Sequence, residues 1–290
     1  MSVDKVLKAQ LWAGRLLAAG FVGFALLCAA ALPALASEPH PWQLGMQPAV
    51  TPVKHRIHDL HNLLLVIITL ISLFVLGLLL YVIWRFNEQR NPVPSRTTHH
   101  TLIEVLWTVV PVFILIIIAI PSFKLLYYMD KTEEAEMTIK VTGRQWYWSY
   151  EYPDHGGFTF DSNILPQDKV SSKKRWLLEV DNELVVPVGT NIRVIIAGSD
   201  VMHSWFIPAL GVQNYAVIGR LNETWINVEK EGTYFGQCNQ ICGVNHAFMP
   251  IAVRAVAKPE FDKWVAEAKT KFAKADGTPV RVAAHAVEGN

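Results

Sequence analysis

Two long apolar blocks place the strongest constraint on what this chain can fold into. Residues 62–84 read NLLLVIITLISLFVLGLLLYVIW and carry no charged side chain, and residues 105–128 form a second block that is almost as apolar. A helix of about 20 apolar residues crosses the hydrocarbon core of a bilayer, which is about 30 Å thick. We therefore predict two membrane-spanning helices that form a transmembrane hairpin.

The segment between the two blocks indicates how the hairpin is oriented. Residues 85–104 carry Arg85, Arg90 and Arg96. Short loops that are rich in arginine and lysine stay on the cytoplasmic side of a membrane. This orientation places residues 37–61, and everything after residue 128, on the extracytoplasmic side.

Residues 1–36 have the features of a cleavable secretory signal. Basic side chains occur near the start, an apolar stretch follows, and the segment ends with the small residues Ala34 and Ala36. This order of features is typical of a signal peptide. The alternative is an uncleaved first transmembrane helix, but Pro33 and the small-residue end favour cleavage.

Residues 129–257 have the pattern of a β domain. Apolar and polar residues alternate in stretches that are rich in Val, Ile, Thr and aromatics, and Pro, Gly, Asn and Asp separate these stretches. Several short strands at such spacing predict an all-β sandwich or barrel. A segment of about 130 residues is long enough to bury a core of its own.

Residues 258–290 are predicted to form a short amphipathic helix and a tail. In the sequence PEFDKWVAEAKTKF the apolar side chains recur at helical spacing. These side chains are Phe261, Trp264, Val265, Ala268 and Phe272. The whole chain has 18% charged residues and a net charge of +1, which argues against nucleic-acid binding.

The stretch YFGQCNQICGVNHAFMP concentrates soft and borderline metal ligands in one loop. Cys238 and Cys242 are followed closely by His246 and Met249, and His203 lies upstream at the end of a predicted strand. Thiolate, imidazole and a weak thioether together suit copper electron-transfer sites. Two alternatives stay open on the residues alone: a structural disulfide between the cysteines, and a histidine that is simply part of the core.

These motifs identify a family resemblance over nearly all of the chain after residue 36. The hairpin and the segments GRQWYWSYEY, LLEVDNELVVP, DVMHSWFIPALG, GRLNETW and GQCNQICGVNHAFMP resemble subunit II of haem-copper cytochrome c oxidases. The resemblance implies that the β domain is a cupredoxin-like barrel with a binuclear copper centre, CuA. It also implies electron transfer from cytochrome c to haem in a partner subunit that reduces oxygen to water, coupled to proton translocation.

The resemblance also assigns roles to individual residues. Cys238 and Cys242 would bridge two coppers, with His203 and Met249 on one copper, and His246 and the backbone carbonyl of Gln240 on the other. The family usually has a glutamate where this chain has Gln240, and that glutamate also holds magnesium, so a weakened or altered magnesium site is expected here.

Further roles implied by the resemblance concern electron and proton movement. Trp146 would receive the electron from cytochrome c, although on the residues alone it is equally a packing aromatic of a strand. Glu104 would stand at the mouth of a proton channel, unless it is only an anchor at the membrane interface. The carboxylates expected to attract a basic cytochrome c are Glu151, Asp154, Asp161, Asp181 and Asp200.

Three other classes of protein share part of this pattern. A quinol oxidase subunit II shares the hairpin and the barrel but lacks the copper ligands, and nitrous oxide reductase has a similar loop but carries a large propeller domain. The third is a membrane-anchored binding module without copper, stapled by a Cys238–Cys242 disulfide. The expected partners are the catalytic subunit I, further oxidase subunits, cytochrome c and the membrane. The predicted signal favours a bacterial plasma membrane, with the copper domain in the periplasm.

Overall fold

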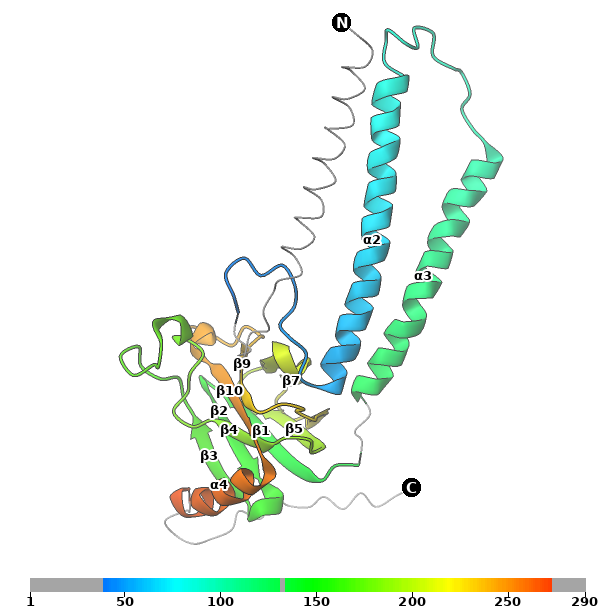
Figure 1. The fold of residues 1–290 in the computed structure, drawn as a ribbon. Helices are drawn as coiled ribbons and strands as arrows, with labels where there is room; N and C mark the ends of the chain where they lie inside the picture. Colours follow the sequence, from blue (N-terminus) through cyan, green and yellow to red (C-terminus); the bar gives the residue numbers. More distant parts are fainter. Residues whose placement is uncertain (1–38, 131–133, 273–290) are drawn as a thin grey trace, which may run out of the picture. The chain divides into compact units, whose positions relative to one another are not determined.

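The structure is a computed structural model, and it describes residues 39–130 and 134–272. The predicted signal peptide at residues 1–36 lies outside the described residues, as does the predicted tail after residue 272. The described part runs from two long helices into a β domain and ends in a short helix (Figure 1). This order confirms the predicted hairpin, β domain and C-terminal helix.

The hairpin consists of α2 (Pro52–Arg85) and α3 (Thr101–Asp130), and both helices are long and apolar enough to cross a membrane. Helix α2 begins ahead of its apolar block at residue 62 because Thr51 caps it. The Thr51 hydroxyl accepts the Lys54 N–H at 3.0 Å and donates to the Leu210 carbonyl at 2.7 Å. A side-chain cap of this kind satisfies a backbone donor that the first turn leaves without a helical partner.

The β domain is built from two five-stranded sheets. One sheet has the order β3 (Phe158–Ser162), β2 (Tyr147–Tyr152), β1 (Met137–Arg144), β5 (Ile192–Gly198) and β8 (Asn222–Ile226). The other has the order β4 (Leu184–Pro187), β10 (Pro250–Val256), β9 (Gly232–Cys238), β6 (His203–Ile207) and β7 (Val212–Ala216). The pairs β1–β5 and β4–β10 are parallel, and the other pairs are antiparallel. Single turns of 3-10 helix are η1 (Pro153–His155), η2 (Lys173–Arg175), η3 (Pro208–Leu210) and η4 (His246–Phe248).

The core of the β domain is formed by the inward side chains of its strands. Strand β1 alternates between buried and half-buried residues along its whole length, as expected for a strand with one face on a core. Ile139, Trp148 and Trp205 are fully buried in one cluster. Each large apolar side chain that is removed from water contributes about 1.5–3 kcal/mol to folding.

The C-terminal helix α4 (Lys258–Lys271) closes one side of this core. Phe261, Val265 and Ala268 are buried, and Trp264 packs against the same cluster. The ring centroids of Tyr152 and Trp264 lie 5.3 Å apart. The predicted apolar face of the helix is therefore the face that packs on the strands.

Candidate metal centre

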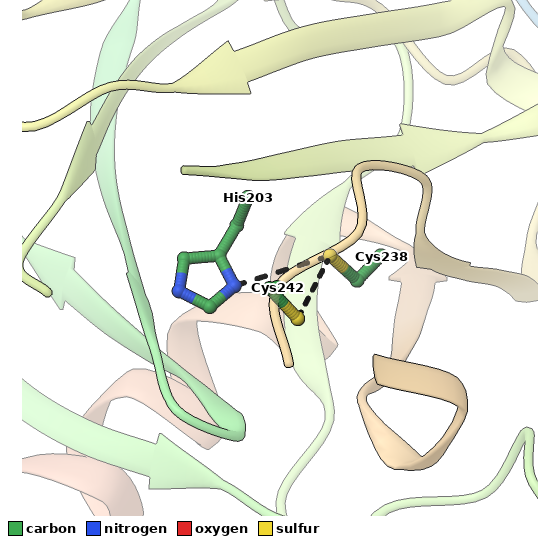
Figure 2. A group of neighbouring side chains, drawn as sticks. All are labelled: His203, Cys238 and Cys242. Carbon is green, nitrogen blue, oxygen red and sulfur yellow. Dashed lines mark hydrogen bonds between the residues drawn. The ribbon is translucent and has the colours of Figure 1, made fainter. Parts of the chain in front are cut away.

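Three of the predicted ligands come together at one end of the second sheet. Strands β6 and β9 pair with Trp205 opposite Cys238, so His203 at the start of β6 lies beside the loop that follows β9. The Sγ atoms of Cys238 and Cys242 are 3.9 Å apart, and His203 Nδ1 lies 3.9 Å from Cys238 Sγ. Figure 2 shows the imidazole pointing toward the two sulfurs. All three side chains are buried.

The other predicted ligands belong to the same loop. His246 Nδ1 lies 3.5 Å from Cys242 Sγ, and the Gln240 carbonyl oxygen lies 3.3 Å from Cys238 Sγ. Met249 is 1% exposed, and its carbonyl accepts the Cys238 N–H at 3.1 Å. The cysteines, both histidines and the carbonyl of residue 240 therefore form one compact group of donors.

The disulfide alternative is wrong for this structure. Cys238 and Cys242 are free thiols, and their sulfurs are separated by 3.9 Å. A disulfide bond is about 2.05 Å long. The alternative of a copper-free binding module with a Cys238–Cys242 disulfide therefore has no support, because contacts rather than a covalent bond hold the loop between the two cysteines.

The electrostatics of the cluster favour one thiolate beside one thiol. Burial raises the pKa of Cys238, but hydrogen bonds with His203 and with the surrounding backbone outweigh burial and lower that pKa. Burial, together with the neighbouring Cys238, raises the pKa of Cys242. Burial lowers the pKa of His203, but its hydrogen bonds with Cys238 and Asp200 raise it overall. A buried, low-pKa thiolate next to imidazole nitrogens is a donor set that suits copper.

The orientation of His203 depends on two neighbours. Its Nε2 atom lies 2.9 Å from Asp200 Oδ1, which leaves Nδ1 facing the cysteines. The ring also packs against Gly143, where a Cβ atom would lie only 2.8 Å from His203 Cδ2. Glycine is therefore required at position 143 because the imidazole approaches the backbone too closely for any side chain.

Trp146 touches the cluster directly. Its indole N–H donates to the Cys242 carbonyl at 3.1 Å, and the Gln145 side-chain amide donates to the same carbonyl at 2.9 Å. Gly243 has a φ of +118°, and a Cβ there would lie 3.0 Å from the Trp146 ring. Gln145 is a site residue that was not predicted from the sequence, where its only signal is its position immediately before the WYW motif.

The predicted docking carboxylates all have partners within the chain. Glu151 is 9% exposed and lies 3.4 Å from Lys140 Nζ. The others accept hydrogen bonds: Asp154 from the Thr138 N–H, Asp161 from the Ser149 hydroxyl, Asp181 from the Asn163 N–H, and Asp200 from the Gln145 N–H. Asp200 is the member of this set that contacts a predicted metal ligand.

Glu104 lies in the first turn of α3, away from the metal loop in the sequence. Its carboxylate accepts the His100 N–H at 3.1 Å, and its own carbonyl accepts the Thr108 hydroxyl at 2.9 Å. A carboxylate in the first turn is favourable there because the N-terminal end of a helix carries partial positive charge. The structure therefore gives Glu104 a capping role at the start of this helix.

The fold and the site together define a class, the β sandwich that follows two membrane-spanning helices and carries a buried cysteine–histidine group able to hold a metal. Family models match both parts of the chain: cytochrome c oxidase subunit II, transmembrane domain, at residues 39–125, and cytochrome c oxidase subunit II, periplasmic domain, at residues 137–256. The chain belongs to the family of cytochrome c oxidase subunit II, and it acts as a subunit of that complex in electron transfer from cytochrome c.

Named relatives agree with this assignment. A probable cytochrome c oxidase subunit 2 of Rickettsia bellii is 48% identical over 266 residues, which cover 92% of this chain and 96% of the relative. Cytochrome c oxidase subunit 2 of Zea mays is 50% identical over 238 residues, which cover 80% of this chain and 92% of the relative. The crystal structure of the periplasmic domain of subunit II from Bradyrhizobium japonicum is 54% identical and covers 49% of this chain and 100% of that domain, with a TM-score of 0.46.

Proposed function

We propose that this subunit accepts electrons from cytochrome c at a binuclear copper centre held by the loop after β9, and passes them to haem in the catalytic subunit. The observation that carries the proposal is the buried group of Cys238, Cys242 and His203. Two coppers bound between the thiolates would supply a one-electron carrier whose geometry changes little on reduction. The protein holds the donors in place, and it buries four of them: Cys238, Cys242, His203 and Met249.

Each donor is proposed to have a definite position in this centre. Cys238 and Cys242 would hold both metals, since their sulfurs lie 3.9 Å apart and both are buried. His203 and Met249 would be the further ligands of one metal, and His246 and the Gln240 carbonyl those of the other. The short contacts of His203 with Cys238 and of His246 with Cys242 support this division of the histidines.

Trp146 is proposed as the residue that receives the electron. It is partly buried against the core, and its N–H donates to the carbonyl of Cys242. This hydrogen bond gives a short connection from an aromatic ring to the backbone of a copper ligand. The carboxylates Glu151, Asp154, Asp161, Asp181 and Asp200 are proposed to attract a basic cytochrome c, which makes association faster at low salt.

The experiment that tests this function compares two tryptophans. Replacing Trp146 with Gln is expected to slow electron transfer at saturating cytochrome c by about tenfold or more, which corresponds to about 1.4 kcal/mol in the barrier. The control is Trp176→Gln, because Trp176 is 38% exposed and packs on Phe248 of the same loop, and within the described residues it makes no hydrogen bond to a proposed copper ligand.

The measurement is stopped-flow reduction of the purified oxidase, together with a copper count per complex. The affinity for cytochrome c should change little in Trp146→Gln. A wild-type oxidase whose copper count leaves no copper for this subunit would refute the proposed centre, and equal slowing by both variants would refute the special role of Trp146.

Gln240 is proposed to leave the copper centre intact while altering a magnesium site at the boundary with the catalytic subunit. Its backbone carbonyl, which faces Cys238, does not depend on the side chain. Its amide oxygen lacks the negative charge that magnesium prefers, and this cation gives up its water reluctantly. Cells grown with manganese should therefore yield a wild-type oxidase with weaker EPR-visible manganese binding than Gln240→Glu. Equal manganese affinity in both proteins would show that residue 240 is not a ligand of that cation.

Glu104 is proposed to serve a proton-uptake channel in addition to capping α3. Its position at the start of the second span, next to the arginine-bearing loop, supports a cytoplasmic location. The predicted signal peptide at residues 1–36 and the same orientation support the proposed wider localisation, a bacterial plasma membrane with the copper domain in the periplasm. Proton translocation and contacts with further oxidase subunits belong to the assembled complex.

A further inference from the structure

The carboxylate of Asp200 collects three N–H donors from separate parts of the site. Oδ1 lies 2.7 Å from the Val201 backbone nitrogen and 2.9 Å from His203 Nε2, and Oδ2 lies 2.7 Å from the Gln145 backbone nitrogen. The side chain is 32% exposed, so one edge still faces solvent. A surface carboxylate that served only to attract cytochrome c would not need this set of bonds.

The bond with His203 determines which ring nitrogen faces the metal. A carboxylate accepts hydrogen bonds and does not donate them, so Nε2 must carry the proton that it shares with Asp200. In the neutral imidazole, the form that binds a metal, the other nitrogen, Nδ1, then carries no proton and faces Cys238. Outer partners of this kind fix the tautomer and the ring orientation of histidine ligands in metal sites.

The bond with Gln145 connects the same carboxylate to the segment between β1 and β2. Gln145 is followed by Trp146, and both side chains donate to the carbonyl of Cys242. A closed path of contacts therefore runs from His203 through Asp200 and Gln145 to Cys242 and returns through Cys238. This path contains a proposed copper ligand, His203, and Gln145, the neighbour in sequence of the residue proposed to receive the electron.

We propose that Asp200 is a positioning residue that holds His203 and the Gln145–Trp146 segment in one hydrogen-bonded frame around residues 238–249, the copper loop. The proposal rests on the copper-centre function proposed above. It gives Asp200 a role beyond the docking of cytochrome c. Asp200 acts through His203 and Gln145, and it does not itself bind the metal.

The chemistry of an amide explains why Asn cannot replace Asp200 in this role. An amide has one acceptor oxygen, and its NH₂ group only donates. In Asp200→Asn the NH₂ group must face either the Gln145 N–H or the His203 N–H, and that contact is lost. The substitution also removes a negative charge beside a ligand of the metal, which favours the reduced form and raises the reduction potential.

The test compares Asp200→Asn with Asp154→Asn in the purified oxidase complex. Asp154 is a matched control because it also belongs to the proposed docking set and also accepts a backbone N–H, from Thr138, but does not touch a proposed copper ligand. The measurements are the reduction potential of the copper centre, its EPR spectrum, the affinity for cytochrome c at several salt concentrations, and the transfer rate at saturation.

We expect Asp200→Asn to raise the potential, change the EPR hyperfine pattern and lower the transfer rate at saturation by about tenfold or more. We expect Asp154→Asn to change the affinity and its salt dependence, with potential and EPR spectrum as in the wild type. If Asp200→Asn changes only affinity, like the control, the positioning role is overturned and Asp200 is a docking charge alone.

A second variant keeps the test decisive if Asp200→Asn fails to assemble. Asp200→Glu retains the charge but displaces the carboxylate by one methylene, so it should keep the affinity for cytochrome c while changing the EPR spectrum. An unchanged spectrum in Asp200→Glu would overturn the proposal. Failure of the copper-centre function itself would be visible earlier, as a wild-type complex without the copper signal.

Discussion

The hairpin and the β domain bury their apolar side chains in different ways. Within the described residues, α2 buries only Val53 and Lys54, and α3 buries none of its side chains. In the β domain, by contrast, residues such as Ile139 and Trp205 are fully buried by the chain itself. The hairpin therefore needs lipid or partner helices to cover its apolar surface, whereas the β domain forms its own core.

The polar groups of the two regions follow the same division. In the hairpin, the polar contacts of Thr51 and Glu104 satisfy the ends of helices. Near the copper loop, Asp200, Gln145 and Trp146 connect residues that are far apart in the sequence. A region that folds against its own core can hold a site in fixed geometry, and the hairpin serves to anchor that region.

The largest expected effect comes from removing one proposed bridging ligand. We predict that Cys238→Ser abolishes the two-copper signal and electron transfer from cytochrome c, because a serine hydroxyl cannot bridge two coppers as a thiolate does. The hairpin should still insert, so the subunit should remain in the membrane fraction.

Copper content, EPR spectrum and immunoblots of membranes measure these outcomes. Ser162→Ala is the control, since it removes a buried hydroxyl from the other sheet. A normal two-copper signal in Cys238→Ser would show that the cluster is not the metal centre. Loss of the subunit from membranes would contradict the contrast between the two regions, because it would show that membrane insertion of the hairpin depends on the metal site of the β domain.

An intermediate effect is expected from matched isoleucine substitutions in the two regions. Ile139 is fully buried, so Ile139→Ala should lower the free energy of unfolding of the β domain by about 2–5 kcal/mol. Ile68 of α2 is 53% exposed in the chain, so Ile68→Ala should leave the β domain unchanged, within about 0.5 kcal/mol.

The thermal loss of the copper absorbance in detergent-purified oxidase measures the stability of the β domain. Equal shifts of the transition temperature from both substitutions would contradict the view that the β domain is stabilised by its own core. A shift of the transition temperature in Ile68→Ala but not in Ile139→Ala would mean that the hairpin, and not the core of the β domain, determines the stability of that domain.

The smallest expected effect concerns the half-buried carboxylate of Glu179, in the segment between β3 and β4. Glu179 accepts hydrogen bonds from the backbone and the side chain of Ser171 and pairs with Arg175. Burial raises the pKa of Glu179, but these contacts outweigh burial and lower it below the ordinary 4.5. Its contribution to stability is therefore present above that value and is lost as the pH falls through the lowered pKa.

We predict that Glu179→Gln weakens the protection of the Ser171 amide against hydrogen exchange at neutral pH, by about 1 kcal/mol. The difference between wild type and variant should shrink as the pH falls below 4.5. A difference that stays constant over this range would mean that the charge of Glu179 does not hold the loop.

The sequence by itself determined the features that depend on composition or on near neighbours. The two apolar blocks predicted the hairpin, because a helix of about 20 apolar residues is long enough to cross the hydrocarbon core of a membrane. The alternation of polar and apolar residues predicted the β domain, and the spacing from Cys238 to Met249 predicted the metal loop. Each of these signals lies within one short stretch of chain.

The tertiary structure alone decided how distant residues meet around that loop. The pairing of β6 with β9 brings His203 next to Cys238, and the segment between β1 and β2 places Gln145 and Trp146 on the Cys242 carbonyl. The tertiary structure also shows that the two cysteines are not bonded to each other and that Asp200 accepts three hydrogen bonds. Hydrogen bonds depend on distances and angles that no spacing along the chain specifies, because strand register and loop packing set them together.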